Sequence, residues 1–279
     1  MSESLVLIDK AKAGEKKKTL IHHLETLDGL VVAFSGGVDS SFLLAVAHQV
    51  LGERVLAATA RSVTYPLKEL EEAKEFAGER GIPHLVFPSD ECSLPEFLSN
   101  SPERCYHCKK SLSRELRRIG EEKGIRHIAH AANLDDLADY RPGMRAAAEM
   151  GIIAPLVDAR LTKEEIRFLS NEMGLSSWDK PAKACLASRV PYGEPITEEK
   201  LKMVGEAEAL LAKEGFRQFR VRYHGPVARI EVERSEIRRI TEEPLRRQIV
   251  EHLRGLGFLH VAVDLEGYVS GSLNRALKK

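Results

Sequence analysis

One loop of this sequence has the composition of a phosphate-binding site. Residues 35–41 read Ser-Gly-Gly-Val-Asp-Ser-Ser, between the apolar run Leu30–Phe34 and a helical pattern. Paired glycines let the backbone turn tightly and approach an anion. A helix start adds free N–H groups and a positive dipole end, and serines add hydroxyl donors. The loop lacks the Lys of a Walker A motif. The predicted phosphate contacts are Ser35, Gly36, Gly37, Asp39, Ser40 and Ser41.

Three cysteines are candidates for metal binding or sulfur chemistry. Cys105 and Cys108 form a C-x-x-C pair, and Cys185 follows in a later loop. In a reducing compartment, a few closely spaced cysteines favour metal or chemistry over a disulfide scaffold. Zinc would need a fourth ligand, which His107 could supply. Cys92 belongs to no motif and is predicted to be structural.

Two arginines alternate along a predicted strand near the carboxyl terminus. Arg220 and Arg222 should therefore point to one face of that strand. A planar guanidinium can bind a phosphate or a carboxylate through two parallel hydrogen bonds. The pattern predicts an anion-binding pair, and the alternative is a solvated strand face.

The elements that must position these residues alternate between strands and helices. Buried strands are predicted at 30–34, 55–60, 84–88 and 125–133, with helices between them. This order predicts an α/β fold with a parallel sheet and helices on both faces. After residue 190 the order becomes helix, strand, strand, helix, strand, which predicts a smaller α+β domain. The expected domains are 1–190 and 191–279.

Composition limits the class of protein. The chain has 279 residues, 43% hydrophobic and 30% charged residues, and a formal net charge of zero. Such a composition is typical of a globular protein, and it argues against extensive nucleic-acid binding, which usually needs a basic excess. No apolar run approaches the roughly 20 residues that span a bilayer. The amino-terminal charges follow the apolar stretch, unlike a secretory signal. A cytoplasmic protein without a membrane partner is expected.

Several longer strings resemble a known family. The loop at 35–41 looks like the PP-loop of the ATP pyrophosphatases. The strings at 58–66, 104–109, 133–149, 178–197 and 220–232 are similar to the LarE family of ATP-dependent sulfur transferases. The resemblance covers about residues 16–275. One departure is Ala131-Ala132, where the family usually has Gly-Thr.

The resemblance implies a reaction and a set of ligands. It implies that ATP adenylates the carboxylates of a pyridinium-3,5-dicarboxylate mononucleotide, which become thiocarboxylates in nickel-pincer nucleotide biosynthesis. It implies ATP phosphates at the 35–41 loop, with Mg²⁺ near Asp39. It also implies nucleotide contacts from Thr59, Ala60, Arg61, Asn133, Asp135 and Asp136, and catalytic or substrate roles for Cys185, Arg189, Glu208, Arg220, Arg222 and Glu231.

The source of sulfur remains open in the sequence. The cysteine trio resembles that of family members with a [4Fe–4S] cluster, in which Cys105, Cys108 and Cys185 would bind three irons and leave the fourth open to sulfide or another sulfur donor. The alternatives are a sacrificial Cys185 beside a zinc or redox pair, and incidental cysteines. The family also implies a homo-oligomer. Rival functions are a tRNA thiolase, an ammonia-using amide synthetase and a metal sensor.

Overall fold

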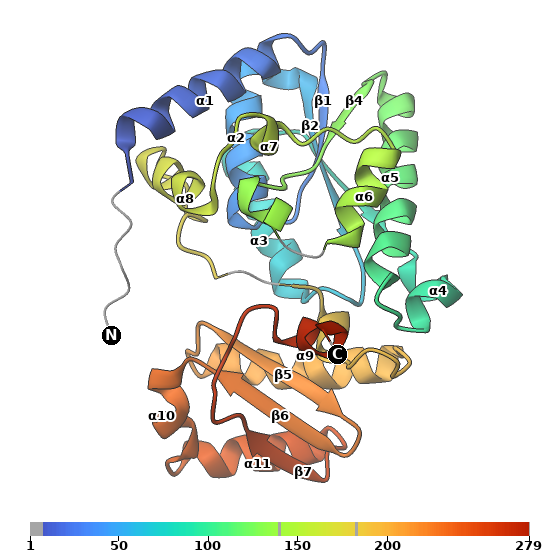
Figure 1. The fold of residues 1–279 in the computed structure, drawn as a ribbon, viewed down its shortest axis with the longest axis vertical. Coiled ribbons are helices and arrows are strands. Elements are labelled where there is room, and N and C mark those ends of the chain that lie inside the picture. Colours follow the sequence, from blue (N-terminus) through green and yellow to red (C-terminus); the bar gives the residue numbers. More distant parts are fainter. Residues whose placement is uncertain (1–7, 139–140, 182–183, 279) are drawn as a thin grey trace. The chain divides into compact units, whose positions relative to one another are not determined.

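The computed structural model describes residues 8–138, 141–181 and 184–278, which form two compact units. The first unit is built from residues 8–61, 67–89 and 105–181. The second is built from 62–66, 90–104 and 184–278. The first contains a four-stranded parallel sheet flanked by helices, and the second contains a separate three-stranded sheet (Figure 1). The α/β fold predicted from the sequence is confirmed.

The sheet of the first unit has the strand order β3-β2-β1-β4. Its strands are β1 (Leu30–Ala33), β2 (Val55–Arg61), β3 (His84–Pro88) and β4 (His127–Ala129). Its helices are α1 (Lys10–Glu25), α2 (Val38–Leu51), α3 (Leu67–Glu79), α5 (Arg104–Lys123), α6 (Pro142–Glu149), α7 (Pro155–Asp158) and α8 (Lys163–Glu172).

Helices cover both faces of this sheet because both faces are apolar. Val32 and Ala57 face a core that includes Leu24 of α1, Phe42 of α2 and Ile166 of α8. The alternate strand residues face a second core that includes α5 and α6; its members are Val31, Leu56, Ile128, Leu116, Ile119 and Ala147. The continuous apolar runs of the sequence are the mark of such doubly covered parallel strands.

The strand order creates a binding edge. The chain goes outward from β1 to β2 and β3 and then returns to β4 on the other side of β1. In open α/β sheets, ligands bind outside the carboxyl ends of the strands at such a reversal. The loop at 35–41 follows β1, and Asn133 follows β4. The fold therefore brings the two predicted motifs to the same edge.

The second unit joins helices to a mixed sheet of order β5-β6-β7. β5 (Phe219–His224) pairs antiparallel with β6 (Val227–Val232), and β6 pairs parallel with β7 (His260–Val263). The helices are α4 (Pro95–Leu98), α9 (Glu198–Lys213), α10 (Ile237–Thr241) and α11 (Leu245–Gly255). The predicted order of elements after residue 190 is present. The domain boundary at 190 stays a prediction.

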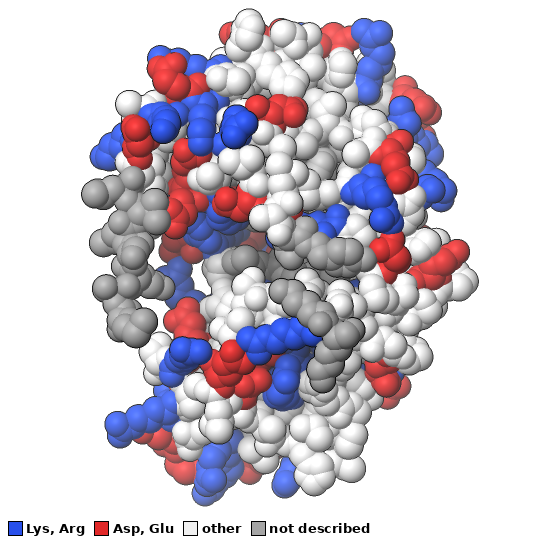
Figure 2. Space-filling model, in the orientation of Figure 1, with Lys and Arg blue, Asp and Glu red and all other residues white. Residues whose placement is uncertain are grey.

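α5 begins at Arg104, so the C-x-x-C pair lies in its first turns and not in a loop before it. No helix in the described ranges has both the length and the apolar character needed to cross a membrane. On the face drawn in Figure 2, basic and acidic side chains are interspersed.

Candidate functional site

The 35–41 loop has the backbone geometry of an anion cradle. Gly36 has φ +70°, and a Cβ there would lie 3.3 Å from the Cβ of Ala73, so both conformation and space favour glycine. Gly37 caps α2, and Ser40 Oγ lies 3.1 Å from Gly37 O and 3.2 Å from Ser35 Oγ. Ser41 Oγ is buried and has no hydrogen-bond partner among the described residues. These groups point to a ligand that accepts hydrogen bonds at the start of α2.

Asp39 links the loop to a lysine that the sequence analysis did not single out. Asp39 Oδ2 accepts a hydrogen bond from Lys163 Nζ at 2.6 Å, across 124 residues of sequence. Burial raises the pKa of Asp39, while the charge of Lys163 and the side chain of Asn133 lower it. Asp39 Oδ1 has no hydrogen-bond partner in the part of the chain described. A carboxylate oxygen without a donor fits a divalent cation, which prefers oxygen ligands.

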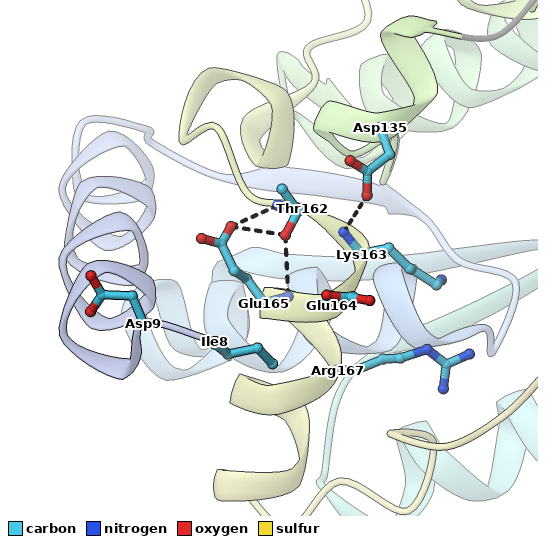
Figure 3. Close-up of a pocket in the computed structure, with 8 residues that line it drawn as sticks. All are labelled: Ile8, Asp9, Asp135, Thr162, Lys163, Glu164, Glu165 and Arg167. Carbon is cyan, nitrogen blue, oxygen red and sulfur yellow. Dashed lines mark hydrogen bonds between the residues drawn. The ribbon is translucent and has the colours of Figure 1, made fainter. Parts of the chain in front are cut away.

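The residues after β4 form a hydrogen-bonded turn beside this carboxylate. Asn133 N donates to Asp136 Oδ2 at 3.0 Å, and Asp135 N donates to Asn133 Oδ1 at 2.9 Å. Asp135 Oδ2 accepts from Lys163 N at 2.8 Å, as Figure 3 shows. Asp135 and Asp136 therefore shape the turn and the start of α8. One oxygen of each is occupied by a backbone N–H.

The start of α8 is fixed by its own sequence. Thr162 accepts from Glu165 N at 3.3 Å, and Glu165 accepts from Thr162 N at 2.9 Å, so the two residues form a capping box (Figure 3). This cap places Lys163 in the first helical turn. A cavity of about 700 Å³ opens here, lined by Ile8, Asp9, Asp135, Thr162, Lys163, Glu164, Glu165 and Arg167. The capping box was the sequence signal that could have directed attention to Lys163.

The end of β2 contains Thr59, whose side chain holds the residue that precedes the 35–41 loop. Thr59 Oγ1 donates to Phe34 O at 2.8 Å and lies 2.8 Å from His84 Nε2. Burial, reinforced by Lys74, lowers the pKa of His84, so its neutral ring can donate to Thr59. The Thr59 hydroxyl is thus committed to holding the residue that precedes the loop. Ala60 is half-buried and Arg61 is exposed, at the same edge of the sheet.

The C-x-x-C pair begins α5, in the first unit. Cys105 is exposed and Cys108 is half-buried, and their spacing places both thiols on one face of the helix. Gly143 of α6 packs against this turn, because a Cβ there would lie 3.3 Å from Cys105 O. Within residues 8–138, 141–181 and 184–278, no group of three or more His, Cys, Asp or Glu residues has the geometry of a metal site.

Cys185 lies in the second unit, just before the 3-10 turn η4 (Leu186–Arg189). It is half-buried, and Leu186 N donates to Thr64 O at 2.8 Å. Cys92 belongs to the same unit, and burial together with Glu91 and other acidic neighbours raises the pKa of its thiol to about 11. Cys92 is therefore a neutral thiol at physiological pH.

The predicted carboxyl-terminal residues form two buried ion pairs. Arg189 binds Glu208 through two hydrogen bonds of 2.7 Å, and Arg222 binds Glu231 through bonds of 3.0 and 2.8 Å. Arg220 is equally buried, and its guanidinium lies 5.0 Å from the ring centroid of Tyr268. Burial and the charges of Arg189 and Arg222 lower the pKa of Arg220.

A cavity adjoins these pairs. It has a volume of about 300 Å³ and is lined in part by Arg189, Arg222, Arg229, Glu231 and Arg275. Glu231 accepts from both Arg222 and Arg229, whose strands pair at these positions. Like charges that face each other across a strand pair repel, and the shared carboxylate offsets this repulsion.

Comparisons with known proteins agree with this architecture. No protein-family profile matches the chain. It is 35% identical, over 96% of its length and 97% of the relative's, to the pyridinium-3,5-bisthiocarboxylic acid mononucleotide synthase of Lactiplantibacillus plantarum. It is 42% identical to protein slr1717 of Synechocystis sp., over 95% and 98% of the two chains. A tRNA-specific 2-thiouridylase of Rickettsia africae is 28% identical over 54% of this chain and 52% of its own.

The similarity to the Lactiplantibacillus synthase extends over nearly the full length of both chains. The phosphate loop on a parallel sheet and the partial match to a thiouridylase are consistent with it. The chain belongs to the LarE family, the sulfur transferases of the PP-loop ATP pyrophosphatase superfamily.

Proposed function

We propose that this protein uses ATP to adenylate the carboxylates of a pyridinium-3,5-dicarboxylate mononucleotide and converts them to thiocarboxylates. The observation that carries the proposal is the 35% identity over almost the entire length of both chains to a synthase named for the bisthiocarboxylic acid product. The geometry of the first unit supports ATP binding and the adenylation step, because the 35–41 loop, its serine hydroxyls and Asp39 lie together at the carboxyl edge of the sheet.

In the first step, a substrate carboxylate oxygen attacks the α-phosphorus of ATP, and the bond to the bridging oxygen breaks to release pyrophosphate. The backbone N–H groups and the hydroxyls of Ser35, Ser40 and Ser41 hold the phosphates, as at other helix starts. Asp39 could hold a Mg²⁺ ion, which would neutralise charge on the phosphate oxygens. Asp39 and Lys163 set the local charge. The acyl adenylate is then open to a sulfur nucleophile, and AMP leaves.

The sulfur donor is the second part of the proposal. In this proposal Cys105, Cys108 and Cys185 would supply three thiolates to a [4Fe–4S] cluster, which leaves one iron without a protein ligand. Two of them lie one helical turn apart at the start of α5. Such a cluster supplies a site for an exogenous sulfide. A sacrificial Cys185 would instead lose its own sulfur once per molecule. Zinc on the C-x-x-C pair is the third arrangement.

Substrate contacts belong to the second unit in this proposal. In this proposal Arg220 offers its guanidinium group to the phosphate or carboxylates of the mononucleotide. Arg222, whose Nε, Nη1 and Nη2 already donate to Glu231, Ser188 and Ser272, contributes mainly its positive charge to substrate binding. Ala60, Arg61, Asn133 and the loop hold ATP. The family likeness also favours a homo-oligomer.

The experiment combines metal analysis with turnover. Anaerobically purified protein is assayed for iron and acid-labile sulfide, and then for pyrophosphate and thiocarboxylate formation from the dicarboxylate mononucleotide. Cys108→Ala and Cys185→Ala are compared with Cys92→Ala as the matched control. About four irons, lost in the first two variants only, support the cluster. An iron-free protein that becomes lighter by one sulfur at Cys185 supports the sacrificial route. The proposed function itself is refuted if the protein forms neither pyrophosphate nor thiocarboxylate.

A second candidate is a tRNA thiolase, because the chain also resembles the Rickettsia thiouridylase. The net charge of zero counts against it, and so do the interspersed charges on the face drawn in Figure 2. Phosphate contacts would make tRNA binding steeply salt-dependent. Retention of tRNA at 50 mM but not at 200 mM salt, with thiolated uridine as product, would favour this candidate.

A further inference from the structure

The backbone around Cys185 is held by buried arginine side chains. Arg189 Nη1 donates to Ala184 O at 2.7 Å and to Cys185 O at 3.3 Å. Arg222 Nη1 donates to Ser188 O at 2.9 Å. Carbonyls on both sides of the thiol are therefore bonded to guanidinium groups, whose hydrogen bonds are stronger than those between neutral partners.

A single carboxylate anchors the first of these arginines. Glu208 of α9 accepts from Arg189 Nε and Nη2, both at 2.7 Å, and also from Val221 N of β5 at 2.9 Å. The side chains of Arg189 and Glu208 are only 3% and 7% exposed. One ion pair thus connects the cysteine turn, a helix and the central part of a strand.

The hydrogen-bonding capacity of Arg189 is almost used up by these contacts. Its Nη1 also donates to Ser188 Oγ at 2.9 Å, so Nε, Nη1 and Nη2 are all bonded to protein atoms. A guanidinium has five N–H donors. Such a buried, saturated group has little left to offer a substrate.

We infer that Arg189 and Glu208 are positioning residues, whose ion pair fixes the direction of the Cys185 thiol by holding the carbonyls beside it. Neither side chain contacts the substrate. The inference deepens the proposed function, on which it rests for the role of Cys185. The inference does not extend to Arg220, whose guanidinium lies 5.0 Å from the ring centroid of Tyr268.

Position matters here because the thiol or its bound group must meet a carbon atom at close range. A displacement of about 1 Å can cost on the order of 100-fold in rate. A substrate-binding residue would instead change KM when removed. The two roles therefore predict different kinetics.

The test replaces both partners with apolar side chains of similar volume, Arg189→Met with Glu208→Leu. Replacing a complete buried pair in this way is often neutral for stability, whereas removing one partner leaves the other charge buried and unpaired. The control is Arg238→Met with Glu242→Leu, an exposed pair of the same unit. Full-length protein prepared without iron is treated with iodoacetamide, and alkylation of Cys185 and of the exposed Cys105 is followed by peptide mass spectrometry.

The inference expects the Cys185 alkylation rate to change at least about threefold while Cys105 is unaffected. It also expects kcat for thiocarboxylate formation to fall on the order of 100-fold at unchanged KM. The control pair should behave like wild type. Arg189→Lys, which keeps the charge but has fewer donors, should shift the Cys185 rate in the same direction and serves if the double variant does not fold.

Wild-type alkylation of Cys185 in a folded double variant would overturn the inference. So would a raised KM at unchanged kcat, which would mark Arg189 as a substrate contact. If wild-type protein makes no thiocarboxylate, the proposed function fails, but the alkylation comparison still decides whether the pair holds the turn.

Discussion

At the scale of single residues, the charge on Asp39 depends on a partner far away in sequence. Asp39 is largely buried, and Lys163 provides the nearby positive charge that keeps its pKa from rising further. Because a buried carboxylate without a cation tends to become protonated, the pair should control both stability and the affinity for a divalent cation.

Replacing Lys163 should therefore weaken the site. We expect Lys163→Met to lower the free energy of unfolding by about 1–3 kcal/mol, the usual cost of stranding a partly buried polar group. Mg²⁺-ATP affinity should fall more than tenfold. Lys163→Arg should retain most of both, since it keeps the charge. Urea unfolding and calorimetric titration with Mg²⁺-ATP measure these effects, and equal losses in the two variants would contradict the electrostatic explanation.

A second prediction concerns His130 and the pH dependence of folding stability. Burial, reinforced by Lys109, lowers its pKa to about 4, from the ordinary 6.5. Above 6.5 the ring is neutral in both states and does not affect stability. As pH falls from 6.5 towards 4, the unfolded chain binds a proton that the folded chain does not, so stability is lost.

The loss amounts to at most about 3 kcal/mol for a shift of this size. His130→Asn should reduce the acid sensitivity of urea unfolding between pH 6.5 and 4, relative to wild type. His22→Asn, at a highly exposed position, should not. Identical pH profiles for His130→Asn and wild type would show that the imidazole is not excluded from protonation.

At the scale of elements, the phosphate loop depends on one glycine conformation. Gly36 combines a positive φ with close contact to α3, while Gly52, at φ +60°, has open space around its Cα. Gly36→Ala should cost about 1–3 kcal/mol of stability from backbone strain and also weaken ATP binding, because the loop must shift. Gly52→Ala should also cost about 1–3 kcal/mol from backbone strain but leave ATP affinity unchanged. Thermal unfolding and ATP titration distinguish the two, and an ATP affinity that falls equally in both would contradict a local effect.

At the scale of the molecule, the second unit is assembled from segments that are distant in sequence. Asn100 Nδ2 donates to Pro191 O and Glu194 O, both at 2.7 Å, and Asn100 O accepts from Gly193 N. Ile196 N donates to Leu98 O at 2.9 Å. A fragment that starts at residue 191 loses all these partners.

The fragment 191–279 should therefore fold poorly by itself, although the sequence predicts a domain there. The backbone groups of half-buried Pro191 and buried Ile196 would lose their hydrogen bonds, each at a cost of about 1 kcal/mol or more. Those of the exposed Gly193 and Glu194 would lose theirs at a smaller cost, because water can replace the partner. We expect a broad, low-amplitude thermal transition by circular dichroism, compared with a sharp one for the full chain. A cooperative transition in the fragment would support 190 as a true domain boundary.

Features with local signals could be predicted from the amino-acid sequence. The apolar runs, the glycine loop, the capping box at Thr162 and the alternation of Arg220 with Arg222 depend on residues a few positions apart, so their periodicity and chemistry are visible in the chain. The strings shared with the LarE family added the expected reaction. The same local signals could not show that α5 begins at Arg104, because a C-x-x-C pair is compatible with a loop or a helix.

Contacts between side chains that are distant in sequence became visible only in the folded chain. Asp39 and Lys163 are 124 residues apart, and Arg189 pairs with Glu208 of a separate helix. The sequence does not show which partner a charged side chain will have, because many carboxylates in the chain could pair with the same arginine. The partner is selected by the strand order and by the burial that excludes water, and both are properties of the folded chain as a whole.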